Sequence, residues 1–194
     1  MERMAEPARR TATYEDLLKV PDGLVAEIIA GELHTSPRPA ARHASAATNV
    51  AADLVGPFGR GRGGPGGWQI LFEPELHLGP DVLVPDLAGW RRERLPIPPE
   101  DDGVIDLRPD WLCEIISPTH AARDLVRKKR IYLQHQVPHY WIIDPRDSML
   151  TVLRWSAPGY VEVLLAQVGE VVHAEPFDQV ELVVSDLFSD FSDE

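Results

Sequence analysis

The sequence has a single cysteine, Cys113, among 194 residues. One cysteine excludes an internal disulfide and any zinc site built from several cysteines. No apolar run approaches the roughly 20 residues that a transmembrane helix needs. The first ten residues are charged, contain alanine and proline, and have no apolar segment behind them, so they are not typical of a secretory signal. From these absences we expect a cytoplasmic protein with no membrane partner.

Basic charge is also scarce, since 19 lysines and arginines face 31 acidic residues and leave a formal net charge of −12. Such an excess argues against a broad surface for nucleic acid, because phosphate backbones need clustered basic side chains. The distribution is uneven, however. Five basic residues and one acid, Asp124, lie between Arg123 and Arg130, whereas acids gather at 100–102 and 186–194. A small basic patch on an acidic body is compatible with phosphate binding.

Length, composition and periodicity predict one α/β (α+β) domain with a central mixed sheet flanked by helices. We expect a flexible tail at 1–10, a single domain at 11–188 and an acidic tail at 189–194. Glycine-rich residues 59–67 read as a connector, and proline-rich residues 95–110 read as a surface loop. The predicted helices cover 11–21, 40–58 and 119–136. The predicted strands are a hairpin at 24–33, a second hairpin of 68–78 with 82–90, and single strands at 111–116, 140–143, 150–155, 160–165, 171–174 and 180–184.

Two acidic residues lie in apolar, strand-like segments. Asp86 follows Val84-Pro85, and Glu114 stands between Cys113 and Ile115. Neighbouring strands would bring the two carboxylates side by side, where they repel unless a cation lies between them. Mg²⁺ suits such a pair because it prefers hard oxygen ligands. The alternative is that one or both acids form an ion pair or cap a turn.

The helix after the Glu114 strand carries a second group of polar residues. Asp124, Lys128 and Tyr132 are spaced four apart and form one stripe, and Arg123 and Arg127 belong to another. Lys128 could offset charge that develops on a phosphate under attack, and the two arginines could hold the phosphate backbone. The alternative is an Asp124–Lys128 pair on an ordinary solvated helix face.

Several motifs occur in a specific order between residues 13 and 188. They are Tyr14–Leu18, Glu27–Leu33, Ser36-Pro37 with His43, Pro85-Asp86, Glu114–Thr119, the Asp124/Lys128/Tyr132 stripe, and Val137–Pro145. In this order they resemble the Uma2 family of endonucleases, a branch of the PD-(D/E)XK restriction-endonuclease-like superfamily.

The resemblance implies a restriction-endonuclease-like core with Mg²⁺, or Mn²⁺, as cofactor. Asp86 and Glu114 would be metal ligands, with the carbonyl of Ile115 as a third. The superfamily pattern would place a lysine at position 116, where this chain has isoleucine. Lys128 on the following helix matches the place to which the lysine has moved in the Uma2-like pattern.

Three further residues match family positions or the helical stripe. Glu27 would be an outer metal ligand, or else an acid on a surface strand. His43 would contact phosphate or water, or else only begin a helix. Tyr132 would either pack in the core or donate a hydrogen bond to phosphate.

The resemblance therefore implies a Mg²⁺-dependent endonuclease that hydrolyses nucleic acid, with DNA as the expected substrate. A homodimer is expected because two sites cut both strands of a duplex more easily than one. The alternative is a non-catalytic binding or assembly module with a nuclease-like fold. The charge of −12 and the missing lysine at 116 motivate this alternative.

Overall fold

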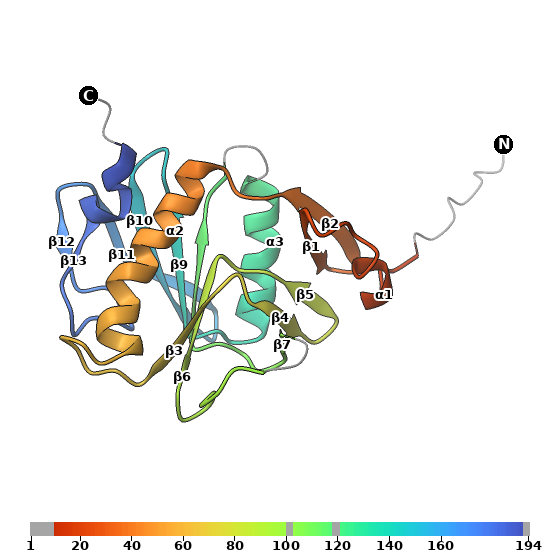
Figure 1. Cartoon of the computed structure of the whole chain (residues 1–194), viewed down its shortest axis with the longest axis horizontal. Helices are drawn as coiled ribbons and strands as arrows, with labels where there is room; N and C mark the ends of the chain where they lie inside the picture. The colour runs from red at the N-terminus through yellow and green to blue at the C-terminus, as the bar shows by residue number, and fades with distance from the viewer. Residues whose placement is uncertain (1–9, 100–102, 118–120, 192–194) are drawn as a thin grey trace.

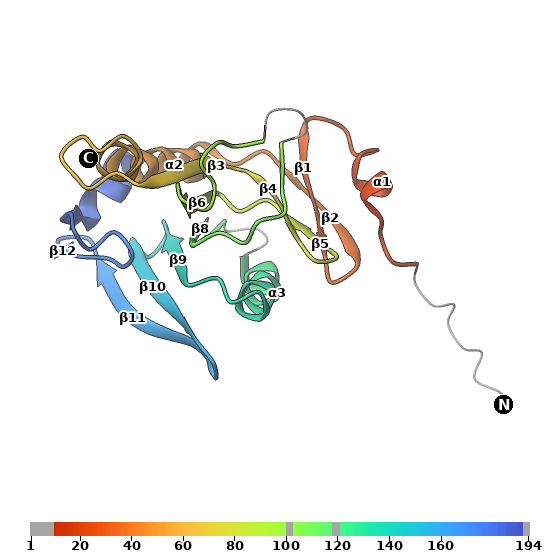
Figure 2. The same ribbon diagram turned by 90° about the horizontal axis from the view of Figure 1, so that it is seen from below.

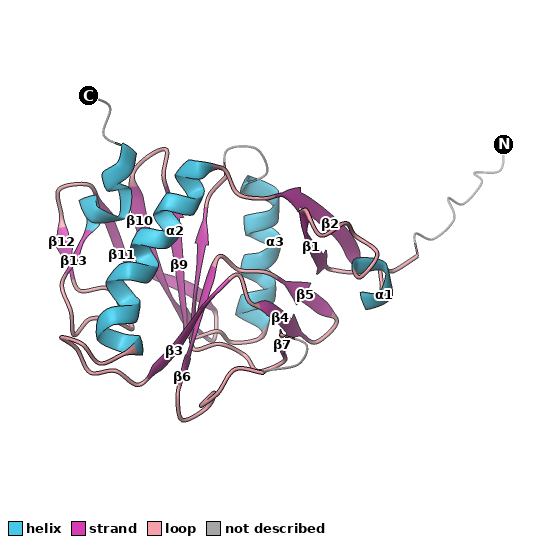
Figure 3. Cartoon of the chain, viewed as in Figure 1, coloured by secondary structure: helices cyan, strands magenta, loops and turns pink. Residues whose placement is uncertain are grey.

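The structure is a computed structural model that describes residues 10–99, 103–117 and 121–191, without the side chains of 121–124 and 189–191. Of the tail predicted at 1–10 only Arg10 is described, and of the tail predicted at 189–194 only the backbone of 189–191, which is helical. The α+β class with mixed sheets is confirmed (Figure 3). No helix in the described ranges is long and apolar enough to cross a membrane.

A six-stranded mixed sheet forms the centre, in the order β11-β10-β9-β8-β6-β3. Its one parallel pair is β8 with β9, and helix α3 connects these two strands. A parallel pair needs such a crossover because a tight turn can join only antiparallel strands. The bounds are β3 Trp68–Phe72, β6 Leu87–Arg91, β8 Trp111–Ile115, α3 Ala121–Gln134, β9 His139–Asp144, β10 Met149–Ser156 and β11 Gly159–Gln167.

Helices cover both faces of this sheet. Figure 2 shows α2 (Ala41–Leu54) on one side and α3 on the other. The alternation predicted for β8 is confirmed, since Trp111 and Cys113 pack in the core on the α2 side and Leu112 packs in the core that contains residues of α3. Glu114 shares its face with Leu112, so its side chain points toward α3.

Shorter elements complete the core on the α2 side. A π-helix, η1 (Val55–Gly59), continues α2 without a break, so the helix predicted at 40–58 is present in two parts. Strands β12 (Val171–Val172) and β13 (Leu182–Val183) form a separate small ribbon, and the 3-10 helix η2 (Val184–Phe191) follows it. The strands predicted at 171–174 and 180–184 are thus present but reduced to two residues each.

A second sheet of five strands has the order β2-β1-β5-β4-β7 (Figure 1). Gly31 has φ +77° in the turn between β1 and β2, which a glycine adopts without a Cβ clash. The helix predicted at 11–21 is wrong in length, because only α1 (Tyr14–Leu17) is helical. The strands are β1 Leu24–Ile29, β2 Glu32–Pro37, β4 Glu75–Leu78, β5 Asp81–Leu83 and β7 Val104–Ile105. Strand β7 lies within the segment predicted as a loop at 95–110.

The second predicted hairpin is wrong as two continuous strands. Its halves belong to different sheets, because β3 and β6 pair in the six-stranded sheet while β4 and β5 pair in the other. The two predicted strands are interrupted at positions that lie opposite each other, Glu73-Pro74 and Pro85-Asp86. Proline lacks the backbone amide that a strand ladder requires. The backbone amide of Glu73 donates to the Asp86 carbonyl (3.0 Å), and Glu73 has φ +43°. The chain therefore passes from one sheet to the other at Asp86.

Candidate active site

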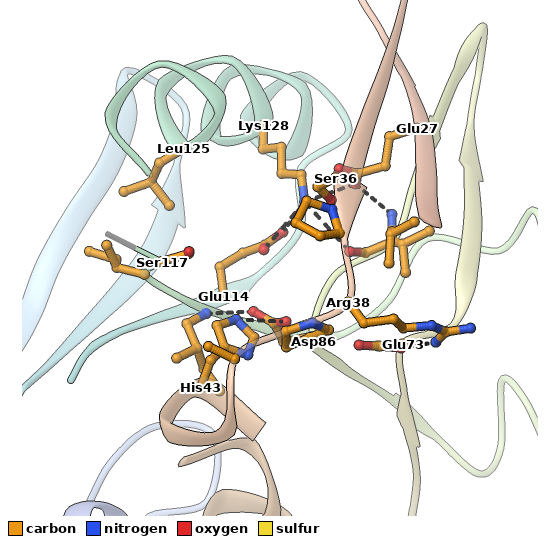
Figure 4. A pocket seen from close by; sticks show the side chains of 17 residues that line it. Glu27, Ser36, Arg38, His43, Glu73, Asp86, Glu114, Ser117, Leu125 and Lys128 are labelled. Atoms are coloured by element: carbon orange, nitrogen blue, oxygen red, sulfur yellow. Dashed lines mark hydrogen bonds and ion pairs between the residues drawn. The ribbon is translucent and has the colours of Figure 1, made fainter. Parts of the chain in front are cut away.

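The two sheets and the first turns of α2 and α3 enclose a pocket of about 290 Å³ (Figure 4). Its polar lining is dominated by carboxylates and cations that come from six separate segments of the chain. These side chains are Glu27, Arg38, His43, Glu73, Asp86, Glu114 and Lys128. Two of them, Glu73 and Arg38, were not predicted from the sequence.

Asp86 and Glu114 face each other across neighbouring strands, as the sequence predicted. Leu87 pairs with Cys113 in the antiparallel β6–β8 ladder, so the preceding Asp86 stands opposite Glu114. The amide of Ile115 donates to Oδ2 of Asp86 at 2.7 Å. This hydrogen bond from backbone to side chain continues the β6–β8 ladder beyond its last backbone pair. It holds the Asp86 carboxylate at the end of β8. Asp86 itself lies in the bend before β6 and not within the predicted strand 82–90.

Glu73 extends this arrangement to a third strand. Phe72 pairs with Leu87, so Glu73, Asp86 and Glu114 occupy successive places across β3, β6 and β8. Nη1 of Arg38 lies 3.4 Å from Oε2 of Glu73. The only sequence signal for Glu73 was an acidic residue before proline inside an apolar run.

Lys128 lies between two carboxylates of different sheets. Its Nζ is 2.8 Å from Oε1 of Glu27 on β1 and 3.2 Å from Oε1 of Glu114 on β8. The lysine side chain is only 10% exposed. Lys128 is therefore not part of a solvated helix face but the cation at the centre of a buried acidic cluster.

Burial and charge shift the pKa values of this cluster. Burial raises the pKa of Glu114 to about 7, Lys128 opposes this shift, and the charges of Asp86 and Glu27 add to it. Burial would lower the pKa of Lys128, but the surrounding carboxylates, first Glu114 and then Glu27, raise it above its ordinary value. Lys128 consequently stays protonated, whereas Glu114 titrates near neutral pH.

Tyr132 and Glu27 hold these groups in position. The buried hydroxyl of Tyr132 donates to Oε1 of Glu114 at 2.7 Å, and its ring packs edge-on against Tyr140. Tyr132 thus belongs to the core and also hydrogen-bonds a site residue, which joins the two alternatives left open by the sequence. Oε1 of Glu27 accepts the Val84 amide at 2.7 Å and so ties β1 to the bend that carries Asp86.

His43, on the first turn of α2, contacts the carboxylate of Asp86. Its Nε2 lies 3.2 Å from Oδ1 of Asp86. Burial would lower the pKa of His43, but its hydrogen bond to Asp86 and the charges of Asp86 and Glu114 raise it above 6.5. The histidine is therefore not a simple helix-start residue, since it orients one oxygen of Asp86.

The two arginines expected to bind phosphate differ in what the structure says of them. The side chain of Arg123 lies outside the described residues. Nη1 of Arg127 lies 3.0 Å from Oε2 of Glu32 and 3.3 Å from Nε2 of His34. Arg127 thus contacts β2 and does not line the pocket. Its expected contact with phosphate remains a prediction.

The donor set can be compared with what a divalent metal requires. Across the described ranges, no three histidine, cysteine or acidic side chains converge on a point that could hold a metal ion. Mg²⁺ nevertheless binds many sites through only one or two carboxylates and completes its shell with water and phosphate oxygens. Asp86 and Glu114 supply that number from facing strands. The role of the Ile115 carbonyl as a third ligand stays a prediction.

Comparisons with known proteins identify the family and the fold of the chain. A family model named Uma2, described as "Putative restriction endonuclease", matches residues 11–185. The chain belongs to the Uma2 family. A solved structure described as a "putative nuclease belonging to DUF820", from Anabaena variabilis ATCC 29413, superposes on this Uma2 protein with a TM-score of 0.73. The two share 21% identity over 92% of this chain and 98% of the other, which establishes the common fold. No curated protein matches the chain.

Proposed function

We propose that this Uma2 protein is a Mg²⁺-dependent endonuclease that hydrolyses phosphodiester bonds in DNA. The observation that carries the proposal is the convergence of Asp86, Glu114 and Lys128 in one pocket from three separate elements. Family membership and the nuclease-like fold support a nuclease in general. Metal dependence and DNA as substrate go beyond that support and rest on the chemistry of the pocket.

Asp86 and Glu114 would hold the metal, together with the Ile115 carbonyl. Bound there, Mg²⁺ or Mn²⁺ would polarise the phosphodiester and make a water molecule more acidic. His43 and the Ile115 amide each bind one oxygen of Asp86 and so fix the direction of its carboxylate. Tyr132 does the same for Glu114.

Lys128 would stabilise the negative charge that grows on the phosphoryl oxygens during attack. A cation that is already positioned and little exposed to solvent does this well, because it need not reorganise during the reaction. Glu27 holds the ammonium group by the 2.8 Å ion pair. We therefore assign Glu27 a positioning role.

A duplex is cut on both strands more readily by two sites, so we also propose that the protein acts as a homodimer. Strand β11 is an edge of the six-stranded sheet, and its Val161 and Leu165 are 49% and 50% exposed. Exposed apolar side chains on an edge strand favour pairing with another chain. Sedimentation equilibrium of wild type and of Val161→Lys/Leu165→Lys tests this. A monomeric wild type would refute it.

A non-catalytic module is the second candidate, and one observation favours it. The Glu114 oxygens already contact Lys128 and Tyr132, so this side chain is satisfied by protein donors alone. In this alternative the cluster serves only to join the two sheets. It predicts that no divalent metal binds and that no nucleic acid is cut.

Metal titration by calorimetry with plasmid nicking in parallel separates the two candidates. We expect wild type to bind Mg²⁺ or Mn²⁺ and to nick supercoiled DNA only with metal. Glu114→Gln and Asp86→Asn should lose both properties and keep the wild-type circular dichroism. Glu15→Gln, an exposed glutamate on α1 that does not line the pocket, is the matched control and should behave as wild type. Nicking by Asp86→Asn at the wild-type rate would refute the proposed mechanism.

A further inference from the structure

Four exposed arginines lie on two segments that meet at the C-terminal end of β6, whereas Asp86 of the pocket precedes the other end of this strand. Arg60 and Arg62 lie in the glycine-rich segment 59–67, and Arg91 and Arg92 lie at the end of β6. The two segments are joined directly. The amide of Arg92 donates to the Gly67 carbonyl at 2.9 Å, and Nη2 of Arg92 donates to the Gly59 carbonyl at 3.0 Å.

The glycine-rich segment is not the plain connector that its composition suggests. The amides of Arg62 and Gly66 donate to the carbonyls of Gly56 and Pro57, both at 2.9 Å, and fold the segment back onto η1. Four of its glycines adopt φ values of +67° to +84°, which other residues rarely tolerate. These are Gly61, Gly63, Gly66 and Gly67. The loop therefore presents Arg60 and Arg62 from a defined backbone.

Within the described residues, these four guanidinium groups contact no carboxylate. That of Arg92 binds a backbone carbonyl, and that of Arg91 lies 4.1 Å from the ring centroid of Trp68. Five arginines elsewhere in the described chain are paired with acids, and Arg108 donates to the Gln136 carbonyl. The five ion pairs are Arg10–Asp16, Arg38–Glu73, Arg94–Asp110, Arg127–Glu32 and Arg154–Glu175. A chain with a net charge of −12 thus holds, in one place, four arginines whose guanidinium groups contact no described carboxylate, although the backbone amide of Arg91 donates to Oδ2 of Asp110 at 2.8 Å.

We propose that Arg60, Arg62, Arg91 and Arg92, named here the arginine patch, bind the phosphate backbone of nucleic acid outside the active site. One guanidinium group can donate two hydrogen bonds to two oxygens of a phosphate. The repulsion between neighbouring guanidinium groups is relieved when a polyanion binds between them. Glycines around them leave room for the backbone of a ligand to approach closely. The identity of the polyanion rests on the proposed nuclease function.

The position of the arginine patch sets the size of the ligand. Asp86 directly precedes β6 and Arg91 ends it, so five residues of extended strand separate the site from the patch. At about 3.3 Å per residue this spans roughly 16 Å. That length corresponds to about five nucleotide steps of a duplex strand at 3.4 Å each. Leu87–Trp90 of β6 are buried, so a nucleic acid that contacts both the pocket and the arginine patch must pass over the surface and span at least this length.

Fluorescence anisotropy with a labelled 30-base-pair duplex in Ca²⁺, over a series of salt concentrations, tests the arginine patch. The variants are Arg60→Ala/Arg62→Ala and Arg91→Ala/Arg92→Ala, with the corresponding lysine pairs as conservative variants. The control is Arg10→Ala/Lys19→Ala, which removes two positive charges, as each patch variant does. Arg10 and Lys19 both pair with Asp16 and are far from the arginine patch in sequence. Thermal melting checks that each variant is folded.

We expect each alanine pair to weaken binding about tenfold and to reduce the slope of log affinity against log salt by about 2, because two phosphate contacts are lost. The lysine pairs should recover most of the salt slope, and the control should match wild type. Wild-type affinity in both alanine pairs, or an equal loss in the control, would overturn the proposal. So would a wild type that binds neither duplex, single-stranded DNA nor RNA, or patch variants that lose only self-association.

Plasmid nicking keeps this outcome separate from that of the proposed function. If the patch variants bind more weakly while wild type never cleaves, the arginine patch stands and the nuclease assignment fails. If wild type cleaves and the patch variants bind as wild type does, the nuclease assignment stands and the arginine patch proposal fails.

Discussion

Lys128 on α3 and Glu27 on β1 form a 2.8 Å ion pair across 101 residues of sequence, between a helix on the central sheet and a strand of the second sheet. The same ammonium group lies 3.2 Å from Glu114. One buried cation thus joins three elements, and its removal would leave two carboxylates facing each other in a medium that solvates them poorly.

Lys128→Met should therefore destabilise the protein as well as inactivate it. Removing one partner of a buried ion pair costs roughly 3–5 kcal/mol, which urea unfolding followed by tryptophan fluorescence would measure. The double variant Lys128→Met/Glu27→Gln should recover part of the loss, because one of the uncompensated charges is gone. A loss below about 1 kcal/mol would show that the pair contributes little.

Metal affinity should depend on pH through Glu114. A metal ligand must be deprotonated, and burial raises the pKa of this carboxyl to about 7. At pH 8 about nine-tenths of the carboxyl is ionised and at pH 6 about one-tenth, so apparent affinity should fall about tenfold over that interval. Calorimetry in buffers of different ionisation enthalpy would also detect the proton released on binding.

Tyr132→Phe provides a test of the same titration. The Tyr132 hydroxyl lowers the pKa of Glu114 by donating to its carboxylate, so its loss should move the pH midpoint of metal binding upward. Tyr160→Phe is the matched control, because the Tyr160 hydroxyl donates to the Val137 carbonyl instead. An unchanged midpoint in Tyr132→Phe would contradict the assigned role.

Arg38 should contribute to substrate binding more than to the chemical step. It lines the pocket with a side chain that is 64% exposed, whereas Lys128 is enclosed. Arg38→Ala should raise KM about tenfold, the value of one hydrogen bond to a charged group, and leave kcat nearly unchanged. Arg146→Ala removes an exposed arginine that does not line the pocket and serves as control. A fall in kcat with constant KM would instead assign Arg38 to the reaction itself.

Cys113 should be inert in the folded protein. Its side chain is fully buried in the core on the α2 side of β8, and burial raises the pKa of the thiol well above its ordinary value. The thiolate is the reactive form, so a thiol reagent should label the protein only after unfolding. Labelling at the rate of a free thiol in native buffer would show that β8 opens readily.

Most of the candidate site could be predicted from residue chemistry, periodicity and family resemblance. Strand alternation placed Glu114 and Cys113 on opposite faces of β8. Helical spacing placed Lys128 and Tyr132 on one stripe of the helix. These are local regularities of the backbone, so they can be read from sequence. Arg127 shows their limit, since its place on the helix did not reveal that Glu32 and His34 lie beside it.

Glu73 and Arg38 could not be found in this way. They reach the pocket because the long hairpin breaks at Glu73-Pro74 and at Pro85-Asp86 and passes between two sheets. The sequence shows the prolines but does not show that the two interruptions lie opposite each other in the folded hairpin. That alignment depends on pairing between distant strands, which is settled by the packing of the whole chain.

By itself, the sequence determined which side chains can do chemistry and on which face of its own element each lies, because these follow from covalent structure and backbone period. Only the tertiary structure decided which of them meet. It joined Lys128 to two acids of different sheets, turned His43 onto Asp86, and brought the glycine-rich loop against the end of β6. Such contacts arise because buried charges and backbone groups must find partners, and those partners are distant in sequence.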